Sequence, residues 1–306
     1  MSPRTSEQDR RLAAIEALVC RDVGRRTQQL IDASRGGLAE AASSLAKATR
    51  VGLITGFFVP RGDVAAPETD GPVGTALLAA ALVACGVPAR IAVDTPSVEA
   101  VRSAVRATGE AVTVDEVVLG REGAIDATIA LWRQDHLSHV VAIERCGRSA
   151  DGKPRNMRGV DVSPWTLPLD TLFEGGNWTK LAVGDGGNEI GMGKLPPGLI
   201  AKHVPNGAEI ACVTSCDQLV VAGVSNWGAY GLMAALAVLR PDWRPTIAKF
   251  LTAERDFFVT DAIVKEAGAV DGVTAQRVAT VDGFGPEVHG PLVDKLGRIA
   301  WGEGAH

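Results

Sequence analysis

The sequence has little aromatic character, with one tyrosine and 5% aromatic residues among its 306 residues. It has no apolar run near the ~20 residues that a membrane-spanning helix needs, and residues 1–10 contain acids but no apolar signal core. Basic residues are not in excess either, because the formal net charge is −5. Broad attraction to nucleic acid or to an anionic membrane is therefore excluded, and we expect a soluble cytoplasmic protein without such partners.

Metal and nucleophile motifs are missing as well. The five cysteines do not follow zinc-ligand spacing, since Cys212 and Cys216 stand four residues apart without a CxxC pattern or a histidine partner. We expect free thiols in a reducing compartment. The histidines do not cluster at metal spacing and no Gly-x-Ser-x-Gly motif occurs. His289 is interpreted as a surface or hydrogen-bonded histidine rather than a catalyst.

What the sequence does contain is an alternation of short apolar runs with longer helical patterns. This alternation predicts an α/β fold, doubly wound, with a mostly parallel sheet and helices on both faces. Since no linker or repeat interrupts it, we expect a single elaborated domain over residues 1–306, with an N-terminal helical segment at about 7–49 that breaks at Gly36-Gly37. Strands are predicted at 51–55, 90–94, 112–119, 138–144, 178–184, 209–213 and 218–222, and helices at 72–85, 97–108, 123–135, 225–240, 255–267 and 291–299.

Ligands of such folds bind outside the carboxyl ends of the strands, and four polar segments follow predicted strands. The first leads to the helix that begins at Pro72, where backbone N–H groups and the helix dipole favour an anion. An ordinary helix cap would also explain Asp70 and Pro72, and this alternative stays open. The candidate residues of this segment are Thr55, Gly56, Glu68, Thr69, Asp70 and Gly71.

The second segment follows the predicted strand at 138–144. Glu144 and Arg145 stand at the end of that apolar strand, where charges must be paired or used. Arg145 and Arg158 have planar guanidinium groups that suit a substrate carboxylate, with a structural ion pair as the alternative. Asn156 is a further candidate for substrate binding.

The third segment, Gly184–Lys194, is rich in glycine, which lets the backbone approach a ligand closely. It matches neither a Walker loop nor GxGxxG. Asp185, Asn188 and Glu189 suit an ammonium group, a hard cation or proton transfer, with a flexible loop as the alternative. The other candidates here are Gly186, Gly187 and, as a cationic donor, Lys194.

The fourth segment, Ser225-Asn226-Trp227, opens the predicted helix at 225–240. Ser225 is interpreted either as the helix N-cap or as a pocket residue. Asn226 adds a hydrogen-bonding amide, and Trp227 adds a large ring wall. The sequence leaves both interpretations open.

Together these segments resemble the D-glutamate cyclase family. The resemblance runs from about Asp22 to Leu296, and it is carried by Glu68–Pro72, Ile143–Arg145, Gly184–Lys194 and Gly223–Gly228. The chain departs from its relatives before Asn156, where they tend to have two tyrosines and it has Lys153-Pro154-Arg155. The resemblance implies that D-glutamate is closed to 5-oxo-D-proline with loss of water, as a lyase does.

The chemistry of this reaction suggests roles. Protonating a carboxylate of pKa about 4.3 at pH 7 costs roughly 3.7 kcal/mol, so activation of the electrophile should dominate the site. We expect Arg145 or Arg158 to hold the α-carboxylate, and Asp185 or Glu189 to orient and deprotonate the amine. Stabilisation of the oxyanion is expected from the Asp70 helix N-terminus and Lys194, and positioning of the substrate from Asn188, Ser225 and Asn226.

Alternatives stay open both for the cofactor and for the function. We expect no organic cofactor, while Asp185 and Glu189 could ligate Mg²⁺ or Mn²⁺. The rival functions are a non-catalytic sensor of acidic amino acids and a racemase on the same fold. A racemase often pairs two cysteines, and Cys146 is the only cysteine near a motif. The sequence leaves a homo-oligomer open.

Overall fold

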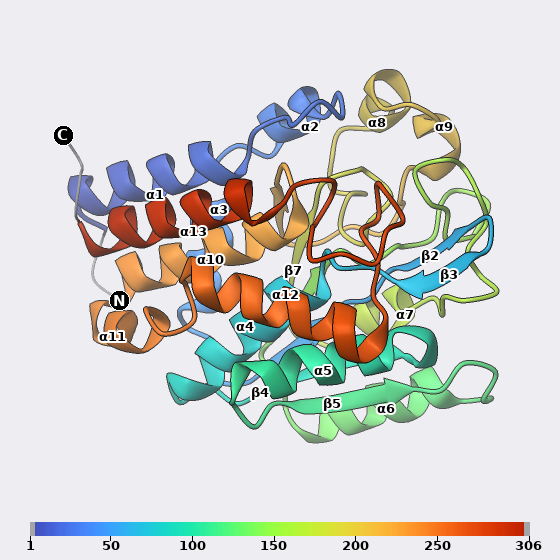
Figure 1. Ribbon diagram of the computed structural model, residues 1–306, viewed down its shortest axis with the longest axis horizontal. Coiled ribbons are helices and arrows are strands. Elements are labelled where there is room, and N and C mark those ends of the chain that lie inside the picture. Colours follow the sequence, from blue (N-terminus) through green and yellow to red (C-terminus); the bar gives the residue numbers. More distant parts are fainter. Residues whose placement is uncertain (1–3, 303–306) are drawn as a thin grey trace.

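The computed structural model describes residues 4–302 (Figure 1). Helices α1 (Ser6–Val19), α2 (Gln28–Ala33) and α3 (Gly37–Leu45) form the N-terminal segment, and Thr5 and Gln8 make a capping box at the start of α1. The predicted break at Gly36 is confirmed, since Gly36 has a φ of 88°. A second interruption at 20–27 was not predicted, and it brings an arginine into the site described below.

The main sheet is parallel, as predicted, with the strand order β5-β4-β1-β6-β7-β8. Val51 of β1 pairs with Ala89 on one side and with His139 on the other. The strands are β1 (Val51–Ile54), β4 (Ala89–Asp94), β5 (Thr113–Val117), β6 (His139–Ile143), β7 (Thr179–Gly184) and β8 (Gln218–Val221).

Helices cover both faces of this sheet, which confirms the predicted α/β fold (Figure 1). Val141 and Ile143 of β6 face the larger helical layer, whereas Val140 and Ala142 face the other side. The larger layer contains α1, α3, α4 (Pro72–Ala84), α5 (Val98–Thr108), α10 (Ser225–Leu239), α12 (Ala253–Ala267) and α13 (Pro286–Trp301). The opposite face carries α2, α6 (Ala124–Gln134), α7 (Asp170–Glu174) and α8 (Leu199–His203).

The predicted strand at 209–213 is wrong. Gly207–Ile210 forms the short helix α9 instead. The residues after it bond to loops rather than to the sheet, since Cys212 N donates to Gly187 O and Val213 N donates to Arg148 O. The remaining short elements are η1 (Thr95–Ser97), η2 (Pro241–Trp243) and α11 (Arg244–Ile247).

An antiparallel hairpin, β2 (Phe58–Arg61) and β3 (Val64–Pro67), follows β1 where the sequence suggested only a loop. The hairpin folds back on its own start, because the backbone N–H of Glu68 donates to Phe57 O at 2.9 Å. The next residue is held by the segment after α12, since Thr69 N donates to Val270 O at 2.9 Å. The hairpin thereby fixes the position of Glu68.

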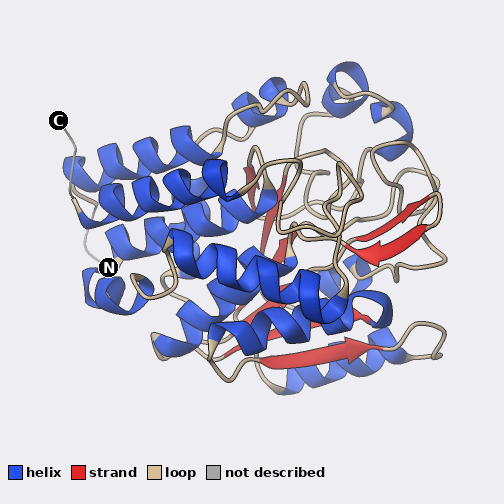
Figure 2. Ribbon diagram, viewed as in Figure 1, coloured by secondary structure: helices blue, strands red, loops and turns tan. Residues whose placement is uncertain are grey.

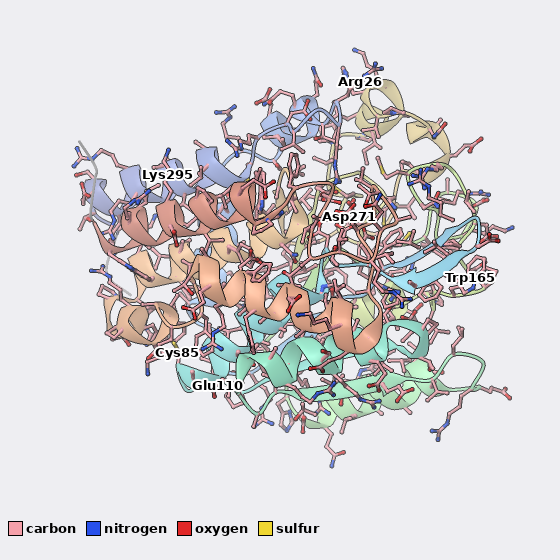
Figure 3. All side chains as sticks on the ribbon, in the orientation of Figure 1. Arg26, Cys85, Glu110, Trp165, Asp271 and Lys295 are labelled. Carbon is pink, nitrogen blue, oxygen red and sulfur yellow. The ribbon has the colours of Figure 1, made fainter. Side chains whose placement is uncertain are left out.

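The strand order creates a topological switch point between β1 and β6. The chain proceeds from β1 to β4 and β5 on one side, and then to β6, β7 and β8 on the other. The loops after β1 and β6 therefore diverge and leave a crevice, where ligands of doubly wound folds bind. Figure 2 shows loops gathered on the side towards which β5 points, and Figure 3 places Arg26 and Asp271 there, away from Lys295 and Cys85.

Among residues 4–302, every helix is too short or too polar to cross a bilayer. The helical layer and both termini of the described chain share one apolar core, which runs from Leu12 to Ala300. The single domain expected over residues 1–306 stays a prediction, although a shared core of this kind is what a single domain would contain.

The buried carboxyl group of Asp256 makes the stability of the protein depend on pH. Asp256 is buried, the hydroxyl of Tyr230 donates to it at 2.5 Å, and burial raises the pKa of Asp256. Its folded pKa lies above its unfolded value near 3.9, so the stability it contributes is lost as the pH rises from about 4. Asp256→Asn cannot ionise and still accepts the tyrosine hydrogen bond.

We expect the free energy of unfolding of Asp256→Asn, relative to the parent, to rise by on the order of 1 kcal/mol between pH 4 and pH 8. Urea denaturation at both pH values measures it. The control is Asp261→Asn on the same helix, which removes the pair that Asp261 forms with the exposed Lys265. Its free energy of unfolding should differ from that of the parent by at most about 0.5 kcal/mol. A constant difference for Asp256→Asn would contradict the prediction.

Candidate active site

A cavity of about 350 Å³ lies at the switch point. Its walls come from the 20–27 segment, the hairpin, the segments after β6 and β7, and the loop between α12 and α13. Such a crevice with converging polar groups is the default ligand site of this kind of sheet. The charged and amide side chains that line it are Arg25, Arg26, Glu68, Glu144, Asn156, Arg158, Asp185, Asn188, Glu189 and Asp282.

The glycine-rich loop after β7 wraps around a carboxylate of its own. Glu189 Oε1 accepts from the backbone N–H groups of Asp185 at 2.9 Å and Gly186 at 2.6 Å, and Oε2 accepts from Gly187 at 2.7 Å. Gly187 has a φ of 107°, which a residue with a side chain rarely adopts. These bonds fix the loop, and they leave Glu189 little capacity to act as the base that the sequence suggested.

Arg25 enters the carboxylate cluster from the 20–27 segment. Its guanidinium lies 2.7 Å from Asp185 Oδ1 and 2.5 Å from Asp282 Oδ2. Burial alone would lower the pKa of Arg25, but the two carboxylates raise it well above its ordinary value, so the arginine stays charged. Asp185 Oδ2 is buried without a hydrogen-bond partner among residues 4–302.

Glu144 takes a strained position directly after β6. Its φ is 44°, a left-handed conformation that a residue with a side chain seldom adopts outside functional sites. Its Oε2 accepts from the hydroxyl of Ser225 at 2.5 Å. The strain aims the Glu144 carboxylate into the cavity, while the next side chain, that of Arg145, points elsewhere.

Four carboxyl groups here have a pKa raised well above the ordinary value, and burial is the main cause for each. Neighbouring carboxylates add to the effect at Glu68, Asp70 and Glu144. At Asp185 the charge of Arg25 partly offsets burial. The site is thus a cluster of buried carboxyl groups that hold their protons to a higher pH than ordinary carboxyl groups do.

Asp70 and Asn226 cap each other's helices. Asp70 accepts from the backbone N–H groups of Ser225 at 3.0 Å and Asn226 at 2.7 Å, which begin α10. Asn226 Oδ1 accepts from Gly71 N at 3.0 Å and Gly74 N at 2.8 Å, which begin α4. Helix capping therefore explains both residues, although Asp70 caps α10 rather than α4, the helix that the sequence suggested. Ser225 itself is not the cap but the partner of Glu144.

The position of Arg145 corrects the expectation that it holds a substrate carboxylate. Its guanidinium is fully buried behind the cavity and pairs with Asp94, at 2.6 Å from Nη2 to Oδ2 and 3.0 Å from Nη1 to Oδ1. It also donates to Gly56 O at 2.9 Å and Leu167 O at 2.7 Å. The structural ion pair, the other interpretation of this segment, is the one observed.

Lys194 and Trp227 are also corrected. Lys194 is exposed, and its Nζ donates to Asp217 O at 2.7 Å, away from the cavity. Trp227 is buried in the helical layer, and its Nε1 donates to His289 Nδ1 at 2.9 Å. Of the two interpretations of His289, the hydrogen-bonded one is observed, and the residue is buried rather than at the surface. The candidates Thr55, Gly56, Thr69 and Gly71 are buried and do not line the cavity.

The structure does bring the other predicted residues together. Arg158, Asn156 and Asn188 line the cavity beside Asp185. Asn188 Nδ2 donates to Arg155 O at 2.8 Å, so it joins the glycine-rich loop to the segment after β6. Gly186 and Gly187 contribute backbone amides to Glu189 rather than direct contacts to the cavity.

Sequence reasoning missed Arg25, Arg26 and Asp282. The first two lie in a segment predicted as helix, and the signal against helix was Gly24, which has a φ of 97°. Arg26 itself has a φ of 65° and Asp282 has a φ of 57°. No pattern in the sequence indicates these strained conformations. Both residues line the cavity, as strained residues at functional sites often do.

Comparison with known proteins agrees with this architecture. Residues 15–297 match the family model described as D-glutamate cyclase-like, C-terminal. The human protein named D-glutamate cyclase, mitochondrial, is 36% identical over an alignment of 216 residues, and the match covers 66% of this chain and 35% of the human protein. The chain thus spans about a third of that relative. Its name places the human protein in mitochondria, so a cytoplasmic location for this chain stays a prediction. On the match over residues 15–297, the chain belongs to the D-glutamate cyclase-like, C-terminal family.

Proposed function

We propose that this chain catalyses the cyclisation of D-glutamate to 5-oxo-D-proline with loss of water. The observation that carries the proposal is the cavity at the switch point, where carboxylates and arginines meet on a family scaffold. An amino-acid diacid needs both kinds of partner, because it bears one ammonium group and two carboxylates. The lyase class follows from the loss of water.

Arginines at the cavity suit the substrate carboxylates. Arg26 and Arg158 are exposed and line the cavity, and the ion pairs formed by residues 4–302 include neither of them. Their planar guanidinium groups can bind a carboxylate with two parallel hydrogen bonds. Buried carboxylates of the cavity, Glu68 among them, favour the ammonium group.

The reaction neither consumes nor releases a net proton, so it needs a group that accepts protons and returns them. The ammonium nitrogen forms the new C–N bond and gives up two protons, and the γ-carboxylate loses one oxygen, which takes both protons and leaves as water. A carboxyl group whose pKa is raised towards neutral can accept and return these protons in turn. Closing a five-membered ring supplies the proximity.

Glu68 is placed for this role. It is 7% exposed, lines the cavity, and forms no side-chain hydrogen bond to residues 4–302. Burial is the main cause of its raised pKa, Asp282 and Asp70 add to it, Arg25 opposes it, and Asp271 adds a smaller effect. Gly272 makes room for it, because a Cβ there would lie 1.5 Å from Glu68 Oε1.

We expect purified protein to convert D-glutamate to a product lighter by one water, with L-glutamate converted more slowly. Mass spectrometry detects the product, and chiral chromatography follows the remaining glutamate. Binding without turnover would indicate a sensor, and mixed enantiomers without loss of water would indicate a racemase; either result contradicts the proposal. Cys146 does not line the cavity, and burial raises the pKa of its thiol, so the chain offers little support for a cysteine-based racemase.

A further inference from the structure

The buried acids of the site outnumber their cationic partners. Within residues 4–302 the cluster consists of Glu68, Asp70, Glu144, Asp185, Glu189 and Asp282, all of them buried, and Arg25 is the arginine that pairs with them. Uncompensated charge in a protein interior is costly and is met by protons, by partners or by metal ions.

Compensation is uneven across the cluster. Arg25 lies between Asp185 and Asp282, and Asp70 is satisfied by the amides at the start of α10. On the other side, Glu144 forms no ion pair with an arginine or lysine of residues 4–302, and it faces Asp185 and Glu189. Positive charge is therefore lacking between Glu144 and the loop after β7.

Each of the three carboxylates at this place keeps an oxygen or a lone pair that the described residues do not use. Asp185 Oδ2 has no hydrogen-bond partner among the described residues although the side chain is only 2% exposed. Glu144 uses Oε2 for Ser225, and among residues 4–302 its Oε1 takes no hydrogen bond. Glu189 Oε2 accepts one amide and keeps a lone pair.

Their spacing suits one ion. Glu144, Asp185 and Glu189 each offer an oxygen, and these oxygens all lie within 4.8 Å of one another. Ligand oxygens on one ion lie no further apart than about twice the metal–oxygen bond, roughly 4 Å for Mg²⁺ and 5 Å for Ca²⁺. A small shift of the side chains would bring the three oxygens onto one ion.

We infer that Glu144, Asp185 and Glu189 form a site for one hard divalent cation, Mg²⁺ or Mn²⁺, at the inner end of the cavity. The unpartnered Asp185 oxygen is the observation that points to a ligand rather than to a mere acidic cluster. Water and substrate oxygens would complete the coordination. Where the proposed function holds, such an ion would supply Lewis-acid polarisation of the γ-carboxyl group, the costly part of the reaction.

The test uses the whole chain and Mn²⁺ alone, without substrate. After dialysis against a chelator, isothermal titration calorimetry and electron paramagnetic resonance should show one saturable Mn²⁺ per chain, displaced by Mg²⁺. Asp185→Asn should weaken this binding at least tenfold, and Glu144→Gln should do the same if the first variant fails to fold. Glu68→Gln is the matched control, since it removes a buried cavity acid outside the proposed ligand set, and it should bind Mn²⁺ within threefold of the parent.

Three results would overturn the inference: no saturable uptake by the parent, unchanged binding in both ligand variants, or an equal loss in Glu68→Gln. The last would indicate diffuse attraction to the acidic cluster. Because binding is measured without turnover, the two proposals fail separately. Cyclisation in the presence of chelator by a parent that binds no Mn²⁺ refutes only the metal site, whereas Mn²⁺ binding without any product refutes only the proposed function.

Discussion

Asp94→Ala should lower the free energy of unfolding by about 3–5 kcal/mol. The variant leaves the Arg145 guanidinium fully buried without its carboxylate, and an uncompensated buried charge is strongly destabilising. It also removes the acceptor of Leu167 N, which donates to Asp94 Oδ2 at 2.8 Å. Chemical denaturation monitored by circular dichroism measures the loss.

Two controls separate the ion pair from general sensitivity of the fold. Glu99→Ala breaks a solvent-exposed pair with Arg102 and should cost at most about 1 kcal/mol. The double variant Asp94→Leu with Arg145→Met replaces both charges by apolar groups and should recover much of the stability. An Asp94→Ala variant of unchanged stability but altered KM would instead support the role in substrate binding that the sequence suggested for Arg145.

The sequence predicted the sheet well because its signals are local. The continuous apolar run at 140–143 indicates a strand buried on both faces, and the structure places β6 there. Polar segments after such strands must share one edge of a parallel sheet, and so Glu144 and Asp185 were correctly expected near each other. These conclusions need only strand direction and hydrophobic pattern.

Side-chain direction after a strand could not be predicted in this way. Glu144 and Arg145 are adjacent, yet one faces the cavity and the other is buried against Asp94. The difference depends on the left-handed φ of Glu144, which tertiary contacts impose. Likewise, no pattern in the sequence indicates that Glu189 turns back onto the amides of its own loop.

The sequence also did not indicate which distant segments contribute residues to the site. Arg25 and Asp282 are far apart in sequence and meet in the cavity, where the segment after α12 bonds to the end of the hairpin. The hairpin itself was missed because Pro60 lies within it, and proline usually argues against a strand. At an edge of a two-stranded ribbon that objection does not apply.

Glu68→Gln should lower kcat for D-glutamate cyclisation by roughly 10²–10⁴-fold, the usual contribution of a positioned acid–base group, with KM changed only a few-fold. The substitution keeps the size of the side chain and removes a buried acid, so the variant should fold. Steady-state kinetics on purified protein measures both constants. Glu122→Gln on the exposed surface is the control and should match the parent.

The pH profile distinguishes proton transfer from a structural effect. Glu68 must be a carboxylate to accept the first proton, so kcat/KM of the parent should fall as the pH drops below the Glu68 pKa. Because burial and the charges of Asp282 and Asp70 raise that pKa, against the opposing charge of Arg25, the fall should begin well above the pH expected for an ordinary glutamate. Glu68→Gln should lose this limb, and Glu68→Asp should restore part of the rate.

Gly272→Ala tests the placement of the same carboxyl group from the other side. A Cβ at position 272 would lie only 1.5 Å from Glu68 Oε1, so the methyl group should displace the carboxylate from the cavity. We expect kcat to fall towards that of Glu68→Gln, and the double variant to be no slower than the slower single one, because both act on one group. Additive losses in the double variant, or a parent-like pH profile in Glu68→Gln, would show that another residue carries the protons.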